Sequence, residues 1–154
     1  MNSEIENLLS LLKHTFEKNA WHGPSVKEVL QGVNADQAFK RLEHTHSIIE
    51  LVGHMTAWRI FVIKKLEGEI DYNVGDDQNF PTTNDWVNVL DDLFISQNKL
   101  LELLKNFPNS KLSEAVPHGS YRYTFYTLLH GIIHHDVYHT GQIALIKKAL
   151  ANPI

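Results

Sequence analysis

Apolar residues recur every three or four positions along most of this chain, and this spacing constrains the fold more than any other feature. In the first segment, for example, Ile5, Leu8 and Leu12 fall on one face of a helix. The alternating pattern of a half-buried β-strand is essentially missing. The spacing predicts long helices over residues 4–20, 36–67, 84–107 and 124–150. Four long helices favour an all-α fold, a four-helix bundle.

Local signals mark the ends of these helices. Ser3 and Glu6 have the spacing of a capping box, which predicts the start of the first helix. Residues 21–24 (WHGP) predict its end, because Gly and Pro stop helices. Ser25 is then placed to cap a short extra helix. The later helices are joined by two polar loops, residues 70–83 and 108–120.

The composition narrows the function classes. The chain has 154 residues, a formal net charge of −4, ten His and no Cys. Disulfides and Cys-ligated metal sites are therefore excluded, and without a basic cluster nucleic acid and anionic membrane are disfavoured as partners. No secretory signal or membrane span is recognisable, so we expect a cytoplasmic protein. Its length and the lack of repeats indicate one domain, residues 1–154.

The four His of the last predicted helix fall into two pairs. With about 100° of rotation per residue, His135 and His139 lie about 140° and 180° from His130. The main apolar stripe of this helix is centred close to His139, so we expect His135 and His139 to point into the bundle. His130 and His134 lie on the other side, and we expect them at a solvent-facing or interface edge.

Two buried His four residues apart need partners, because each unsatisfied ring nitrogen costs roughly 1–3 kcal/mol. Their spacing puts both rings on one face, within reach of a single ion bound at about 2.0–2.1 Å. Hydrogen bonds to buried carbonyls or hydroxyls are the alternative, and the spacing alone leaves both interpretations open.

A third ligand must come from another helix, because no His, Asp or Glu follows His139. Two features argue against a zincin: the downstream ligand is missing, and Asp136 stands where a zincin has Glu. His54 shares an interior helix face with Trp58 and Phe61, which makes it the natural candidate. A core His with ordinary hydrogen bonds remains the alternative for His54.

The remaining His are weaker candidates. His14 lies on the polar side of the first helix, and His46 faces away from His44. On the predicted second long helix, His44 lies about 15 Å along the axis from His54, too far to share an ion. Two more fall in predicted loops, where exposure is the expected state: His22 and His118.

Two segments resemble the DinB/YfiT-like family: HSIIELVGHMTAW on the second long helix and HGIIHHDVYHTGQI on the last. The family pattern has one His on the second helix and a His-x-x-x-His pair followed by x-Gly-Gln on the fourth. The matching positions are His54, His135, His139, Gly141 and Gln142.

The resemblance extends over nearly the whole chain. The segment Trp21–Ser25 and the Trp58 that follows His54 are also similar to the family. One departure is Thr140, where many members carry Arg before Gly-Gln. This departure leaves the three His untouched and puts any substrate contact made by that Arg in doubt.

The resemblance implies an up-down-down-up four-helix bundle with a three-His site for a divalent ion, often zinc or nickel. Residues 70–83 would be the crossover, because about 14 residues at about 3.3 Å each span roughly 46 Å, enough to recross a bundle. It also implies a homodimer and a small-molecule substrate. Characterised relatives include transferases that use low-molecular-weight thiols, and others are described as metal-dependent hydrolases.

Three function hypotheses follow. A transferase would use the metal to activate a small thiol cosubstrate, since the chain has no Cys of its own. A hydrolase would use metal-bound water as nucleophile and a carboxylate as base, for which Glu50 is the best candidate. Trp58 and Gln142 are candidate substrate contacts. A non-catalytic metal-binding or interaction module is the third hypothesis, and ordinary structural roles stay open for Glu50, Trp58 and Gln142.

Overall fold

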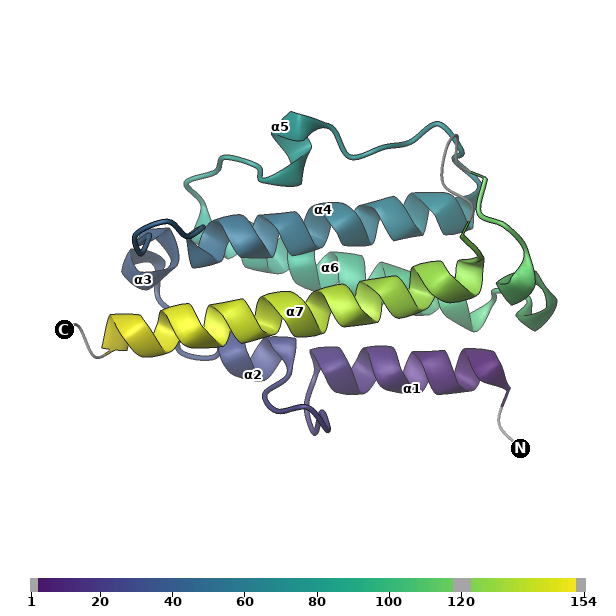
Figure 1. Cartoon of the computed structure of the whole chain (residues 1–154), viewed down its shortest axis with the longest axis horizontal. Helices are drawn as coiled ribbons and strands as arrows, with labels where there is room; N and C mark the ends of the chain where they lie inside the picture. Colours follow the sequence, from purple (N-terminus) through teal and green to yellow (C-terminus); the bar gives the residue numbers. More distant parts are fainter. Residues whose placement is uncertain (1–2, 118–122, 152–154) are drawn as a thin grey trace.

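The computed structural model describes residues 3–117 and 123–151, whose backbone is largely helical (Figure 1). The α-helices are α1 (Glu4–Phe16), α2 (Val26–Leu30), α3 (Ala35–Phe39), α4 (Ile48–Glu67), α5 (Asp76–Asn79), α6 (Trp86–Lys105) and α7 (Phe125–Ala151). A 3-10 helix, η1, spans Asn109–Ser113, and an isolated bridge pairs Ala115 with Thr124. The predicted all-α fold class is confirmed, including the short extra helix after the first.

The long helices α1, α4, α6 and α7 lie side by side. Both α1 and α4 pack against α6 and α7, so each long helix contacts two others. In Figure 1, α1 and α7 run from right to left, whereas α4 and α6 run from left to right. The connection between α4 and α6 therefore returns along the length of the molecule. In the described part of the chain, no helix is long and apolar enough to cross a membrane.

The prediction of a single helix over residues 36–67 is wrong, because a break divides this range into α3 and α4. Residues 40–47 separate α3 from α4 without helical structure. His44 has a left-handed φ of 60°, and Ser47 is extended, with a ψ of 164°. The Glu50 carboxylate accepts a hydrogen bond from the backbone N–H of Ser47, the N-cap residue (2.7 Å). This hydrogen bond gives that N–H a partner and marks the start of α4.

The other predicted boundaries differ less. The first helix ends at Phe16, earlier than the predicted end near Ala20, because the Glu17 carbonyl accepts a hydrogen bond from the Ser25 hydroxyl (2.9 Å). The capping box of Ser3 and Glu6 is present as predicted. The loop predicted over residues 108–120 contains η1, and its residues His118 and Gly119 lie outside the described residues.

Buried apolar side chains form two clusters along the bundle. One cluster includes Leu104 and Leu129, and the other includes Ile48 and Ile143. All four of these side chains are fully buried. Burial of a side chain of this size stabilises the fold by about 1.5–3 kcal/mol, so the two clusters hold the helices together from both ends.

A polar layer separates the two apolar clusters and joins the four long helices. Arg59 of α4 pairs with Asp136 of α7, and its Nε donates to Oε1 of Gln97 in α6 (3.1 Å). Gln97 in turn donates to the Leu12 carbonyl of α1 (3.3 Å). Arg59 and Asp136 are fully buried, and Gln97 nearly so. We call this set of Arg59, Asp136, Gln97 and the Leu12 carbonyl the central polar network.

The crossover between α4 and α6, residues 68–85, carries α5 and lies against α4 (Figure 1). Gly68 ends α4 with a φ of 89°, a conformation that favours glycine. A close approach follows farther on, because a Cβ at Gly53 of α4 would lie 2.8 Å from Cγ of Pro81. The absence of a side chain at Gly53 therefore lets the crossover lie directly on α4.

Candidate metal site

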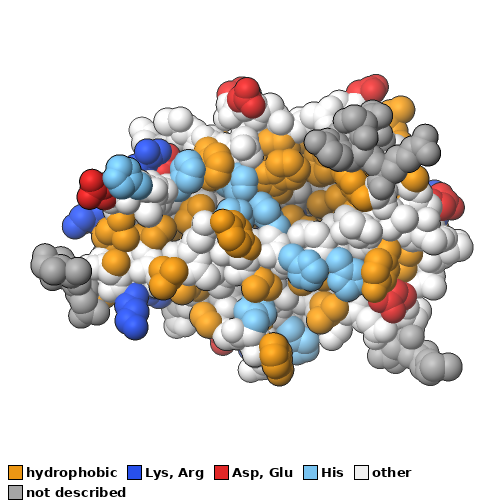
Figure 2. Space-filling view, in the orientation of Figure 1, with side chains coloured by type: hydrophobic (Ala, Val, Ile, Leu, Met, Phe, Trp, Pro, Cys, Tyr) orange, Lys and Arg blue, Asp and Glu red, His pale blue; other side chains and the backbone are white. Residues whose placement is uncertain are grey.

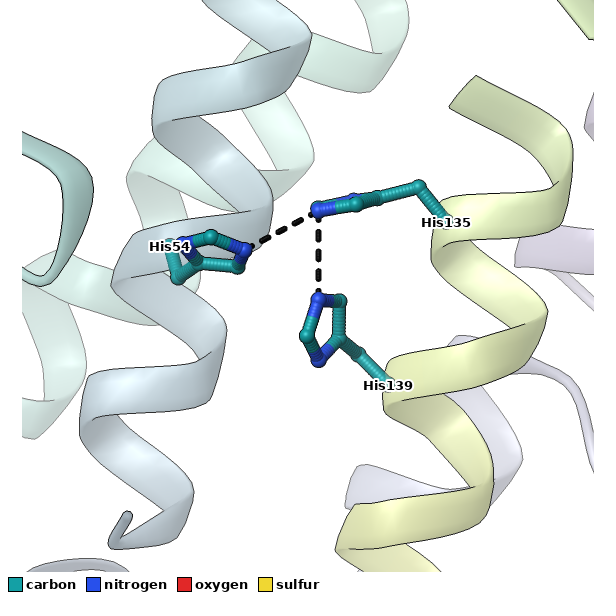
Figure 3. Close-up of side chains that lie close together, drawn as sticks. All are labelled: His54, His135 and His139. Atoms are coloured by element: carbon teal, nitrogen blue, oxygen red, sulfur yellow. Dashed lines mark hydrogen bonds between the residues drawn. The ribbon is translucent and has the colours of Figure 1, made fainter. Parts of the chain in front are cut away.

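His side chains gather on the face of the molecule formed by α4 and α7, beside apolar side chains (Figure 2). His54 comes from α4, and His135 and His139 come from successive turns of α7 (Figure 3). Nε2 of His135 lies 3.0 Å from Nε2 of His54 and 3.1 Å from Nε2 of His139. His54 and His139 are buried, and His135 is half-buried. The three His predicted from the sequence as metal ligands therefore lie together.

Two hydrogen bonds fix how the rings of His54 and His139 present their Nε2 atoms. Nδ1 of His54 lies 2.6 Å from the backbone carbonyl of Asn79, and Nδ1 of His139 lies 2.6 Å from Oε1 of Gln142. Both partners are oxygens that accept, so each Nδ1 carries the proton and donates. The Nε2 of each ring then keeps its lone pair, which points to the centre of the cluster.

The three rings do not satisfy one another. His135 as a neutral imidazole has one N–H, which can pair with only one of the two lone pairs that face its Nε2. Its Nδ1 is buried and has no hydrogen-bond partner in the part of the chain that the structure describes. Burial, and after it the neighbouring His139 and His54, lowers the pKa of His135 to about 3, which disfavours a second proton. Burial also lowers the pKa of His54 and His139.

A divalent cation fits this donor set. Two nitrogens bound to one ion at about 2.0–2.1 Å lie about 2.9–3.4 Å apart when their bonds meet at about 90–110°. The observed 3.0 and 3.1 Å fall in that range, and the candidate ligand atoms of all three His lie within 4.8 Å of one another. The three His could therefore hold a metal ion through nitrogen atoms whose lone pairs already converge.

Aromatic rings surround His54. Phe80 stacks on the His54 ring, with ring centroids 4.2 Å apart. Phe80 also stacks on the His46 ring, with ring centroids 3.8 Å apart. Trp58 lies edge-on to His54 at 6.3 Å and donates its indole N–H to Oδ1 of Asn79 (2.9 Å). Asn79 thus holds His54 with its carbonyl and Trp58 with its side chain. The crossover is therefore part of the site.

Trp58 and Gln142, the two candidate substrate contacts, both lie at the cluster. The Trp58 ring is 6.2 Å from the His135 ring, and Gln142 accepts from His139. Through this hydrogen bond Gln142 orients the ring of His139, a candidate metal ligand. Contact of either residue with a substrate stays a prediction.

Glu50, the candidate base, is held by other groups. Its carboxylate pairs with Arg41 and accepts hydrogen bonds from the Ser47 backbone N–H (2.7 Å) and hydroxyl (2.8 Å). The hydrogen bond from Arg41 is the largest cause that lowers the pKa of Glu50 to about 2, despite its partial burial. A carboxylate of such low basicity accepts a proton poorly at neutral pH. Its role as a base stays a prediction that these contacts do not favour.

The other described His do not join the cluster. His130 and His134 have ring centroids 6.1 Å apart; His134 is exposed, whereas His130 is half-buried and its Nε2 is buried. His14 and His44 are exposed as well. His46 was expected on a long helix, yet it lies in the non-helical segment before α4 and reaches the site by stacking on Phe80.

The residues that orient the candidate His ligands were not predicted from the sequence. Asn79 and Phe80 lie in a stretch predicted as a plain polar loop, and no helical or strand spacing marks them. Asp136 did carry a signal, because it lies about 240° from His130 on the same helical projection, close to the apolar stripe. A buried carboxylate at that position requires a partner, and Arg59 of α4 provides it.

The fold and the site together define a class of protein: an all-helical protein in which His side chains from two neighbouring helices form a candidate site for a divalent metal. The chain belongs to the DinB superfamily, whose family model matches residues 19–143. That range includes His54, His135 and His139. No curated protein and no solved structure matches the chain significantly.

Proposed function

We propose that this protein is a metal-dependent transferase with a DinB-type up-down-down-up four-helix bundle. His54, His135 and His139 hold a divalent ion, zinc or nickel, and a low-molecular-weight thiol is the cosubstrate. The observation that carries the proposal is the convergence of the three Nε2 atoms at 3.0 and 3.1 Å in a buried site. Imidazole nitrogens suit both metals.

Three protein ligands leave at least one coordination position free, which is the arrangement of catalytic sites. A divalent ion held by His54, His135 and His139 would lower the pKa of a thiol or water beside it, and so would supply a nucleophile at neutral pH. In the transfer, the thiol sulfur forms a bond to carbon of the electrophile, the leaving group departs with its bonding pair, and the thiol proton is released. Because the chain contains no Cys, the sulfur comes from the cosubstrate.

The side chains around the cluster act by orienting it. Asn79 and Gln142 hold His54 and His139 in the tautomer that presents Nε2, and partners of this kind typically contribute 10–100-fold in metal affinity, by order of magnitude. Phe80 and Trp58 cover His54 and restrict the access of water. None of these roles needs a strong base.

The hydrolase is the second candidate, and the state of Glu50 disfavours it. Attack by water needs a group that takes up its proton, and the carboxylate predicted for this task is paired with Arg41 and has a pKa of about 2. A thiol is far more acidic than water, so a transferase depends less on such a base. This difference supports the transferase.

The partners and the compartment remain proposals as well. We propose a homodimer in the cytoplasm that acts on a small molecule. Support for the dimer comes from the outer side of α7, where Tyr138 and Leu145 are exposed by 64% and 71%. Light scattering on the purified chain tests the dimer, and a monomer at micromolar concentration would refute it.

Metal content tests the site. We expect about one zinc or nickel ion per chain in the purified protein, measured by inductively coupled plasma mass spectrometry. The His135→Ala, His139→Ala double variant should lose it. The His130→Ala, His134→Ala variant is the matched control, because it removes another pair with the same spacing from the same helix and should keep the ion. Retention of the metal by the first variant would refute the site.

Turnover tests the reaction. The wild-type protein is screened with several small thiols and electrophiles, with and without a chelator, and we expect thiol-dependent product that the chelator abolishes. Hydrolysis of an ester or amide without thiol would favour the hydrolase instead. Bound metal without either activity would favour the non-catalytic module.

A further inference from the structure

A pocket of about 320 Å³ opens between α4 and α7 and reaches His135 of the candidate metal site. Trp58 and Phe61 line it from α4, Leu128 and Ile132 line it from α7, and His135 belongs both to its wall and to the His cluster. Figure 2 shows apolar side chains gathered beside His side chains on this face. A group bound in the pocket would therefore lie directly beside His135.

The chemistry of the lining selects an uncharged guest. The surface of the pocket is almost entirely apolar, and among the described residues no Asp, Glu, Lys or Arg lines it. The indole N–H of Trp58 is already donated to Asn79, so it offers no free donor to a guest. Among the described lining residues no side chain carries a charge that would compensate a charged group for its lost hydration.

The pocket is open to solvent on the α7 side, because Thr127 and Gly131 are exposed. A Cβ at Gly131 would meet no atom within 4 Å, so the missing side chain adds to the open space. The volume is about twice that of the engineered apolar cavity of about 150 Å³ that binds benzene. A guest of bicyclic aromatic size matches this volume.

We propose that this pocket binds an uncharged apolar group of the electrophilic substrate, of about the size of a naphthyl ring, next to His135. The assignment to the electrophile rests on the proposed function, in which the thiol would be bound by its sulfur at an ion held by the three His and the electrophile would be held by other contacts. The pocket provides such contacts beside His135. The binding of the apolar group itself depends only on the pocket.

Binding of two matched probes tests the inference by isothermal titration calorimetry on the full chain as purified. The probes are 2-naphthalenemethanol, which is uncharged, and naphthalene-2-sulfonate, which has the same ring system and a negative charge. We expect the alcohol to bind about tenfold or more tightly than the sulfonate, because only the sulfonate loses charge hydration. The titrations are repeated with chelator, so that attraction of the sulfonate to an ion is removed.

A variant that fills the pocket supplies the decisive comparison. Gly131→Leu should weaken binding of the alcohol by about tenfold or more, because the new side chain occupies the space of the guest. Gly141→Leu is the matched control: it lies on the same helix, its Cβ also meets no atom within 4 Å, and it is not in the pocket wall, so binding should be unchanged. Thermal unfolding followed by circular dichroism verifies that both variants fold.

Gly131→Ala is a milder version that adds one methyl group and should weaken binding to a smaller extent than Gly131→Leu. Equal binding of the alcohol by wild type and a folded Gly131→Leu variant would overturn the inference, and so would no binding by the wild type. These outcomes differ from failure of the proposed function. Metal content and thiol-dependent turnover without probe binding refute the pocket alone, whereas probe binding without metal refutes the transferase and leaves the pocket.

Discussion

Replacement of Arg59 by Met is the most direct test of the central polar network. The variant keeps an unbranched apolar side chain in place of the arginine stem and removes the charged end. Asp136, which is fully buried, then loses its ion pair, and Gln97 loses the hydrogen bond from Arg59 Nε. The cation–π contact of the guanidinium with the Phe16 ring, 5.0 Å from its centroid, is lost as well.

The expected cost is large for a single substitution. Removal of one partner of a buried ion pair typically destabilises a protein by about 3–5 kcal/mol, because the other charge stays buried without compensation. A protein of this kind is stable by only about 5–15 kcal/mol, so the variant should lose a substantial part of its free energy of unfolding. Met replaces the lost volume, which keeps the contribution from a cavity small.

Urea unfolding at pH 7, followed by circular dichroism with chelator present, measures the loss. The Arg59→Met, Asp136→Leu double variant is the companion measurement, because it removes both charges. Replacement of a whole buried pair by apolar groups is often neutral or stabilising, so the double variant should be more stable than Arg59→Met alone. A cost below about 1 kcal/mol for Arg59→Met, or a double variant as unstable as the sum of the two single ones, would refute this account of the network.

Three further predictions concern α4 and its ends. Gly53→Ala gains about 1 kcal/mol of helix propensity, yet its Cβ would lie 2.8 Å from Cγ of Pro81, so we expect the crossover to shift and metal affinity to fall, as measured by competition with a chromogenic chelator. An unchanged affinity would contradict this. Gly68→Ala should destabilise by about 1 kcal/mol in urea, because φ is 89° there; equal stability would exclude strain. Glu50→Gln tests the pairing with Arg41: the folded-state pKa of about 2 lies below the ordinary value of 4.5, so this stabilisation is present above pH 4.5 and is lost as the pH falls towards 2. The urea midpoints of wild type and Glu50→Gln should therefore differ at pH 7 and converge at low pH, and a constant difference would argue against the ion pair.

Two residues of the candidate metal site could be predicted from the sequence because their geometry is local. His135 and His139 lie four residues apart, and one turn of a helix places both rings on the same face whatever surrounds it. His54 could be proposed from its own helix face, but its partnership with α7 depends on how two helices pack. The resemblance to a family provided that step, and the structure places the three rings together.

The support of the site could not be predicted in the same way. Asn79 and Phe80 reach His54 through the path of the crossover, which no periodic pattern encodes. The start of α4 is different, since Ser47 and Glu50 have capping-box spacing in the sequence itself. Continuous helical spacing from Asp36 outweighed that signal, although the local hydrogen bonds of Glu50 decide the structure.

The crossover is a connection and also a part of the site, and this limits how its length can vary. Residues 71 and 73 are exposed, so an insertion near them need not move Asn79 from its place on α4. The Asn79 carbonyl orients His54, and Pro81 lies against Gly53 of α4. An insertion between Asn79 and Pro81 would change the spacing between these two contacts and displace one of them. Variation in this segment, natural or engineered, is therefore tolerated before α5 and restricted after it.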